Sequence, residues 1–271
     1  MEIRENVILA PYTTFRIGGP ARYFCEVESV GDLKNALDFS KENDLRFFIL
    51  GGGSNILVSD KGFDGLVIKM GIRGLEFKDE KDRTILSAGA GENWDEVVVA
   101  AVERNLGGIE NLSLIPGTAG AAVYQNIGAY GVELKDVFES AEVLDAGSGE
   151  IKTFSNNDCR FGYRDSVFKT DKGRNLIILK VNLKLPKSRE SDISYPDLTK
   201  IFEGKKPSVS EVRNALIQIR RDKLPYSGEV GSVGSFFKNP VIPETQFKNL
   251  TLNHSDLKGF SLDNGLVKLS A

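Results

Sequence analysis

Apolar and polar positions along the chain follow two different periods, which together predict a mixture of strands and helices. Apolar positions three and four residues apart predict a helix that Ser29 caps and that runs to about Asn43, and another over residues 93–105. A third helix is expected to begin at the capping box formed by Ser208 and Glu211. Short apolar runs predict strands over residues 21–27, 46–50, 66–69, 84–88 and 176–185.

Turn residues and composition organise these elements further. Residues 141–146 and 150–154 flank Gly147-Ser148-Gly149, a pattern that predicts a β-hairpin. A strand–helix–strand order near the N-terminus favours a ligand at the carboxyl end of the second strand, as in other α/β sheets. The composition turns polar from Lys187, which indicates a junction between domains.

Bulk composition narrows the class of protein. A chain of 271 residues with 41% hydrophobic and 27% charged residues suits two or three compact globular units. A net charge of −3 without a basic stripe argues against a nucleic-acid partner. No apolar run reaches bilayer length and the first five residues carry no secretory signal, so we expect a cytoplasmic protein without a membrane partner.

The few cysteine and histidine residues limit the possible chemistry. Cys25 and Cys159 have neither metal-ligand spacing nor a disulfide framework, and we interpret both as buried structural residues. The chain has a single histidine, His254, which excludes a multi-histidine zinc site. A Ser-His-Asp triad is possible only if His254 is its histidine. We therefore expect no metal site, and we expect proton transfer to come from another residue type.

Residues 115–131 are the first candidate binding stretch. A turn at Pro116-Gly117 leads into a run of glycine and alanine, whose backbone can approach a flat or phosphorylated ligand and offer it N–H groups. Gln125 and Asn126 add amides that suit the edge of a heterocycle. Taken alone, this run is better explained by tight backbone packing inside a sheet, but two further stretches change that interpretation.

The first of these stretches joins an apolar strand to Gly51-Gly52-Gly53-Ser54-Asn55. Its physical character is that of a phosphate-cradling loop, although it matches neither the dinucleotide-binding nor the Walker pattern. The second stretch, residues 159–166, reads Cys-Arg-Phe-Gly-Tyr-Arg-Asp-Ser and concentrates a tyrosine, two arginines and an aspartate.

Together with Gly234-Ser235-Phe236-Phe237-Lys238-Asn239-Pro240, these segments resemble the UDP-N-acetylenolpyruvoylglucosamine reductases. The resemblance runs from Thr13 onward and keeps the family's motif order. It implies an α+β flavoprotein fold: a two-part FAD-binding domain of the vanillyl-alcohol-oxidase (PCMH) type over residues 1–70 and 71–186, then a smaller substrate-binding domain over residues 187–271. It also implies non-covalent FAD, NADPH as hydride donor, and a monomer that converts UDP-N-acetylglucosamine enolpyruvyl ether to UDP-N-acetylmuramate for peptidoglycan synthesis.

The same resemblance assigns expected roles. Arg164 would hold the substrate carboxylate, whereas from composition alone it would form a surface pair with Asp165. Ser235 would donate the proton, whereas without the motif it would be a turn residue. The expected FAD contacts are Thr14, Arg16, Gly51, Gly52, Gly53, Ser54, Asn55, Ile115, Pro116, Gly117, Thr118, Gly120, Gln125, Asn126 and Gly128. The expected substrate contacts are Tyr130, Tyr163, Tyr195, Lys223 and Asn239, of which Tyr130 and Tyr195 favour the branch with a tyrosine-bearing loop.

One departure from the family keeps alternatives open. Family members continue beyond Ala271 into a segment with a catalytic glutamate, so we expect a C-terminally truncated chain with an incomplete substrate domain, which keeps FAD but turns over poorly. One rival is a catalytically impaired protein that binds FAD and a UDP-sugar. A second rival, an alcohol oxidase on the same flavin fold, is disfavoured by the single histidine and by Ser235 in its motif.

Overall fold

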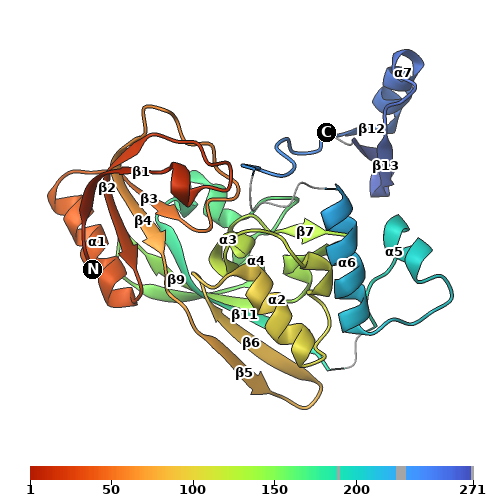
Figure 1. The fold of residues 1–271 in the computed structure, drawn as a ribbon, viewed down its shortest axis with the longest axis horizontal. Coiled ribbons are helices and arrows are strands. Elements are labelled where there is room, and N and C mark those ends of the chain that lie inside the picture. Colours follow the sequence, from red (N-terminus) through yellow and green to blue (C-terminus); the bar gives the residue numbers. More distant parts are fainter. Residues whose placement is uncertain (188–189, 224–229, 270–271) are drawn as a thin grey trace. The chain divides into compact units, whose positions relative to one another are not determined.

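The computed structural model describes residues 1–187, 190–223 and 230–269 and divides into two compact units, Met1–Ser232 and Val233–Ala271 (Figure 1). The first unit contains both larger sheets, and the second contains a small sheet with one α-helix. The compact units therefore divide at Ser232, and residues 190–223 belong to the first. A functional boundary near residue 186 stays a prediction.

The N-terminal sheet of the first unit has the strand order β1-β2-β4-β3, with β1 (Arg4–Ile8), β2 (Pro20–Val27), β4 (Phe63–Met70) and β3 (Phe47–Leu50). Both β2 and β3 run parallel to β4, and β1 pairs antiparallel with β2. Helix α1 (Val30–Glu42) connects β2 to β3, and its Ser29 cap accepts the Asp32 N–H at 3.1 Å. The glycine loop thus begins at the carboxyl end of a parallel strand, as expected.

The second sheet has the order β10-β9-β11-β6-β5, and all its pairs are antiparallel. Its strands are β5 (Leu75–Asp79), β6 (Arg83–Gly89), β9 (Phe138–Asp145), β10 (Ile151–Ser155) and β11 (Leu176–Pro186). Helix α3 (Ala119–Tyr124) contacts β11 and β6, and α2 (Trp94–Glu103) contacts α3. The apolar side of α2, with Trp94 and Val98 buried, closes the core on this side.

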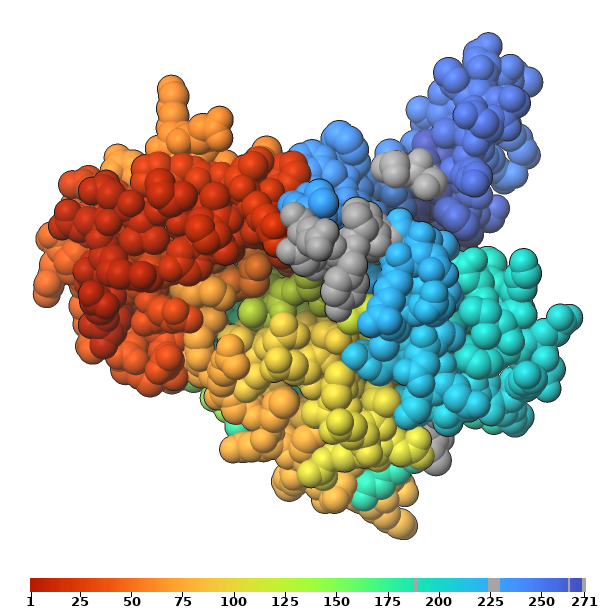
Figure 2. Space-filling model, viewed as in Figure 1, coloured from red at the N-terminus to blue at the C-terminus, as the bar shows by residue number. Residues whose placement is uncertain are grey.

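Helix α6 (Val209–Lys223) packs against α2 and the short helix η2 (Glu110–Leu112), and its surface lies beside that of α2 (Figure 2). The predicted capping box is present, because Glu211 N donates to Ser208 Oγ and Ser208 N to Glu211 Oε2. Other short elements of the first unit are η1 (Ala10–Tyr12), β7 (Gly128–Ala129), β8 (Val132–Glu133), η3 (Leu134–Asp136), α4 (Asn156–Cys159), η4 (Val167–Lys169), η5 (Asp171–Gly173) and α5 (Pro196–Ile201).

The second unit has a three-stranded antiparallel sheet of order β12-β14-β13. Its elements are β12 (Val241–Pro243), α7 (Glu244–Asn253), β13 (Gly259–Leu262), η6 (Asp263–Gly265) and β14 (Leu266–Leu269). Val267 on β14 is its one fully buried apolar side chain among the described residues.

The predicted strands, helices and hairpin are confirmed to within a few residues. Strand β1 at the sheet edge, whose residues are nearly all exposed, was not predicted, and neither was the polar β5. The short strands β7 and β8 of the first unit and the strands β12, β13 and β14 of the second were not predicted either. Taken alone, the small-residue run was interpreted as backbone packed inside a sheet. In the structure it forms helix α3 instead. Both cysteines are fully buried. In the described part of the chain, none of the helices is both long and apolar enough to span a bilayer.

Candidate functional site

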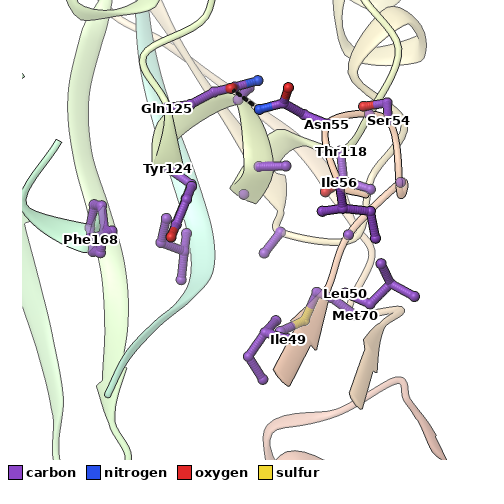
Figure 3. Close-up of a pocket in the computed structure, with 18 of the residues that line it drawn as sticks. Ile49, Leu50, Ser54, Asn55, Ile56, Met70, Thr118, Tyr124, Gln125 and Phe168 are labelled. Carbon is purple, nitrogen blue, oxygen red and sulfur yellow. Dashed lines mark hydrogen bonds between the residues drawn. The ribbon is translucent and has the colours of Figure 1, made fainter. Parts of the chain in front are cut away.

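A cavity of about 520 Å³ lies in the first unit between the end of β3, helix α3 and strand β11 (Figure 3). Its volume falls within the range of about 300–1,000 Å³ that is usual for small-molecule sites. Most of the expected cofactor contacts line it: Gly51, Gly52, Gly53, Ser54, Asn55, Ile115, Pro116, Gly117, Thr118, Gly120 and Gln125. The fold thus brings together two loops that are far apart in sequence: Ser54 and Pro116, for example, are 62 positions apart.

The two loops interlock through their backbones. A Cβ atom on Gly52 would lie 2.6 Å from the Cα of Gly117, so only glycine permits this approach. The Ser54 hydroxyl donates to the Pro116 carbonyl at 2.9 Å, and the Asn55 amide donates to Gln125 Oε1 at 2.6 Å (Figure 3). Tight packing of the two backbones therefore already accounts for the glycine at position 52.

Hydrogen bonding occupies several carbonyls of the two loops but leaves their N–H groups available. The carbonyls of Gly51 and Gly53 accept from Lys69 Nζ and Thr14 N, and those of Pro116 and Gly117 accept from Ser54 Oγ and Trp94 N. By contrast, the N–H groups of residues 52–55, 117 and 118 donate to no acceptor among the described residues. The available N–H groups of the two loops form a cradle suited to an anionic group such as a pyrophosphate.

The start of helix α3 does not add to this cradle. Ala119 N donates to the Glu92 carbonyl and Gly120 N to the Ala90 carbonyl, so these two amides are already occupied. Gly120 has a packing role instead, because a Cβ there would lie 2.9 Å from the Cβ of Ala90.

An extensive apolar wall completes the cavity, and the sequence analysis did not identify it. Its residues come mainly from β3, β11 and the segments before β11, and Tyr124 and Arg174 also line the cavity. The largest apolar contributors are Phe47, Phe48, Ile49, Leu50, Ile56, Met70, Ile127, Phe168, Leu176, Ile177 and Ile178. The apolar run of β11 was visible in the sequence, but nothing local showed that it faces a cavity. Trp94 is buried at the cavity and donates its Nε1–H to the Leu112 carbonyl at 3.0 Å.

Four of the expected cofactor contacts do not line the cavity. Thr14 lies next to Gly53, and its buried hydroxyl has no partner among the described residues. Arg16 is exposed with φ 57°. Asn126 is fully buried, and its side chain bonds Gly162 O, Glu133 Oε2 and Lys135 N, so its amide serves protein contacts. The fourth residue, Gly128, lies in β7.

Arg164 is half-buried and points at β7. Its guanidinium donates to the Gly128 carbonyl at 2.5 Å, and its Cζ lies 5.9 Å from the centre of the Tyr163 ring. No ion pair joins Arg164 to Asp165 in the described ranges, so the surface pair considered as the alternative is not formed. Instead, Asp165 Oδ1 accepts the N–H of Ser166.

Three of the expected substrate contacts lie together. The rings of Tyr130 and Tyr195 meet edge to face with centres 5.0 Å apart, and Lys223 pairs with Asp197. Burial raises the pKa of Tyr130 above its usual value, while the nearby guanidinium of Arg220 and ammonium of Lys223 oppose the rise. The hydrogen bond to Asp197 raises the pKa of Lys223.

Asn111 and Arg220 belong to this cluster and were missed by the sequence analysis. The buried Asn111 amide donates to the carbonyls of Tyr130 and Asp192 at 2.9 and 2.8 Å, and so ties the two tyrosine segments to η2. Arg220 precedes Lys223 by three positions on α6, and that helical spacing was the available signal.

Ser235 and Asn239 belong to the second unit. Ser235 is exposed in a turn that follows Gly234, whose φ is 62°. The neighbouring rings of Phe236 and Phe237 pack edge to face with centres 5.0 Å apart, and both are largely exposed.

Comparison with known proteins agrees with this geometry. The family model described as "FAD binding domain" matches residues 21–155. Over 275 aligned residues and the whole of this chain, the sequence is 43% identical to a UDP-N-acetylenolpyruvoylglucosamine reductase of Amoebophilus asiaticus and 42% identical to one of Pseudomonas savastanoi pv. phaseolicola. The alignments cover 81% and 80% of those proteins. The crystal structure of the corresponding reductase from Thermus caldophilus superposes with a TM-score of 0.66 at 26% identity, over 98% of this chain and 88% of that one. The expected α+β FAD-binding fold is thereby confirmed.

Proposed function

Since this chain belongs to the UDP-N-acetylenolpyruvoylglucosamine reductase family, we propose that it reduces the enolpyruvyl ether of UDP-N-acetylglucosamine to UDP-N-acetylmuramate, a precursor of peptidoglycan. It is an FAD-dependent oxidoreductase that takes its hydride from NADPH. The observation that carries the assignment to this site is the cavity of about 520 Å³ with two interlocked loops at its rim.

The residues present fit FAD. Backbone N–H groups of residues 52–55, 117 and 118 would hold the pyrophosphate, because they donate to no acceptor among the described residues. The apolar wall would pack against the isoalloxazine, and the linked amides of Asn55 and Gln125 lie at the cavity edge. The chemistry that FAD supplies when bound is hydride transfer from NADPH to the vinyl CH₂ carbon of the substrate.

Arg164 is proposed to bind the substrate carboxylate. Hydride addition to the vinyl carbon leaves an enolate-like charge on the adjacent carbon, which the carboxylate shares. A guanidinium can bind that carboxylate through two parallel hydrogen bonds and stabilise the charge as it grows. The hydrogen bond to the Gly128 carbonyl fixes the direction of the Arg164 side chain.

Ser235 is proposed to donate the proton that completes the reduction. An isolated serine hydroxyl is a weak acid, but an enolate conjugated to a carboxylate is a base strong enough to accept its proton. An ammonium group, such as that of Lys223 or Lys238, would stabilise the serine alkoxide as it forms. Tyr130, Tyr163, Tyr195, Lys223 and Asn239 are proposed to contact the UDP-sugar, and the cluster of Tyr130, Tyr195 and Lys223 supports this group. We further propose a monomer that works in the cytoplasm, where NADPH is supplied; light scattering after gel filtration tests the monomer.

The deciding experiment is the absorbance spectrum of the purified protein, recorded without oxygen before and after NADPH. We expect a bound-flavin spectrum that NADPH bleaches and that UDP-N-acetylglucosamine enolpyruvyl ether restores, with UDP-N-acetylmuramate formed in equal amount. Protein without flavin would refute the assignment of the cavity. Bleaching without recovery on the ether would favour a protein that only binds, and recovery by oxygen alone would favour an oxidase.

A further inference from the structure

Leu114 has an unusual backbone conformation directly before the second cofactor loop. Its φ of 55° lies in the left-handed region, which costs free energy for a residue with a Cβ atom and persists only where the surroundings impose it. The next residues, 115–118, line the cavity. Whatever holds Leu114 in this conformation also determines where that loop begins.

Both peptide groups of Leu114 are held by charged side chains. Its N–H donates to Asp95 Oδ1 at 2.7 Å, and its carbonyl accepts from Arg220 Nη2 at 3.2 Å. Hydrogen bonds in which one partner is charged are stronger than those between neutral groups. Leu114 is therefore held from α2 on one side and from α6 on the other.

Asp95 is in turn fixed by Arg213. The guanidinium donates from Nη1 to Oδ1 at 2.7 Å and from Nη2 to Oδ2 at 2.8 Å, which is the parallel two-bond geometry. The pair is sheltered, with 12% of the Arg213 side chain and 24% of the Asp95 side chain exposed, and it joins α6 to α2 where their surfaces meet (Figure 2). Although burial alone would raise the pKa of Asp95, the bonds from Arg213 and from the Leu114 N–H hold that pKa below its usual value. The carboxylate is thus charged at neutral pH.

We infer that Asp95, fixed by Arg213 and assisted by Arg220, holds Leu114 in its left-handed conformation and thereby positions residues 115–118 for FAD. Asp95 is a positioning residue, since it acts on the cofactor through the loop. The inference rests on the proposed function, because it requires residues 115–118 to contact FAD. The remaining anchors of this loop, Ser54 Oγ on Pro116 and Trp94 N on Gly117, act after Leu114 and do not fix its conformation.

The test compares Asp95→Ala and Asp95→Asn with Glu96→Gln as the matched control. Glu96 lies in the same first turn of α2 but is exposed, so its variant removes one charge at the same helix end without touching Leu114. FAD release from the diluted holoprotein, followed by flavin fluorescence, gives the dissociation constant. Circular dichroism in the flavin absorption bands reports how the bound ring is held.

We expect Asp95→Ala to raise the FAD dissociation constant roughly ten- to a hundredfold, as loss of hydrogen bonds to a charged group does. Asp95→Asn keeps an acceptor for the Leu114 N–H and should show a smaller increase, and Glu96→Gln none. Arg213→Gln should weaken binding too, and adding it to Asp95→Ala should add little, because both remove one interaction.

A rescue variant separates positioning from general stability. Asn adopts positive φ more readily than Leu, so Leu114→Asn added to Asp95→Ala should recover part of the FAD affinity and of the flavin dichroism. Lower melting temperatures with unchanged FAD affinity and dichroism would overturn the inference, as would the absence of any recovery. If wild type and Glu96→Gln themselves lack FAD, the proposed function fails, whereas tight FAD binding by Asp95→Ala overturns the positioning role alone.

Discussion

Residues 51–55 and residues 234–240 both place glycine and serine in a turn, yet the two segments are built differently. The first is packed so closely against another backbone that Gly52 has no room for a Cβ atom, and the Gly51 carbonyl and the Ser54 hydroxyl both have protein partners. The second is exposed, a Cβ on Gly234 would have no atom within 4 Å, and Phe237 is 72% exposed beside it. The proposed cofactor contacts are thus built into the backbone of a large core, whereas the proposed acid is an exposed side chain of a small unit.

This difference suggests that the two halves of the reaction can be disturbed separately. Changes in the first segment should act through cofactor binding and affect both halves. Changes in the second should leave the cofactor in place and affect only the step that needs a proton. The predictions below test this separation.

The largest effect is expected from Gly52→Ala. Its new Cβ would lie 2.6 Å from Gly117 Cα, so the two loops must separate and the N–H cradle is lost. We expect protein without flavin, measured as the ratio of flavin to protein absorbance. Gly31→Ala is the control, because a Cβ there would have its nearest neighbour at 3.7 Å. Normal flavin content in Gly52→Ala would contradict the role of close backbone contact.

Ser235→Ala should affect one half of the reaction only. We expect flavin reduction by NADPH at the normal rate and reoxidation by the enolpyruvyl ether slowed about 10²–10⁴-fold, as for loss of a positioned acid. Stopped-flow absorbance of each half in single turnover measures both rates. Ser235→Cys should regain part of the loss, and Ser261→Ala, another exposed serine of the second unit, should change neither half. Equal slowing of both halves would show that Ser235 is not the acid.

Arg164→Lys should also slow the second half, by about 10²–10³-fold, because a lysine keeps the charge but cannot bind a carboxylate through two parallel bonds. Flavin content should stay normal, since Arg164 does not line the cavity. The exposed Arg160 of the same segment supplies the control Arg160→Lys. An unchanged second half in Arg164→Lys would assign the carboxylate to another residue.

The smallest signal is expected from thiol labelling, which measures how often local opening of the first unit exposes its buried cysteines. Burial raises the pKa of Cys25 to about 11 and that of Cys159 to about 12, so little thiolate exists at about pH 8. Iodoacetamide should label neither cysteine of the native protein, and both after denaturation. Labelling of native Cys159 would show that the segment carrying Arg164 opens readily.

Local signals made much of the fold predictable. The caps at Ser29 and Ser208 and the apolar stripe of α2 are short-range patterns, and they gave the correct helices. Strand β5 was missed because its polar residues resemble a loop. Helix α3 was missed because a run of alanine and glycine has no polar face to reveal its period.

The candidate site was predictable where it depends on glycine and unpredictable where it depends on tertiary contacts. Loops 51–55 and 115–118 could be recognised because missing side chains are visible in a sequence. Asn111 could not be, because the carbonyls that it binds are 19 and 81 positions away. The same holds for Asp95, whose partner Arg213 is 118 positions distant.

The use of main-chain donors in the cradle has a consequence for how such a site changes over generations. No single codon encodes the groups that would hold the pyrophosphate, because every residue except proline carries an N–H. Selection can therefore act on these donors mainly by excluding bulk, and side chains that do not anchor the loops can change while the donors persist. Recognition by main-chain donors should therefore persist while much of the surrounding sequence changes, because the requirement is only that no side chain fills the space beside the donors.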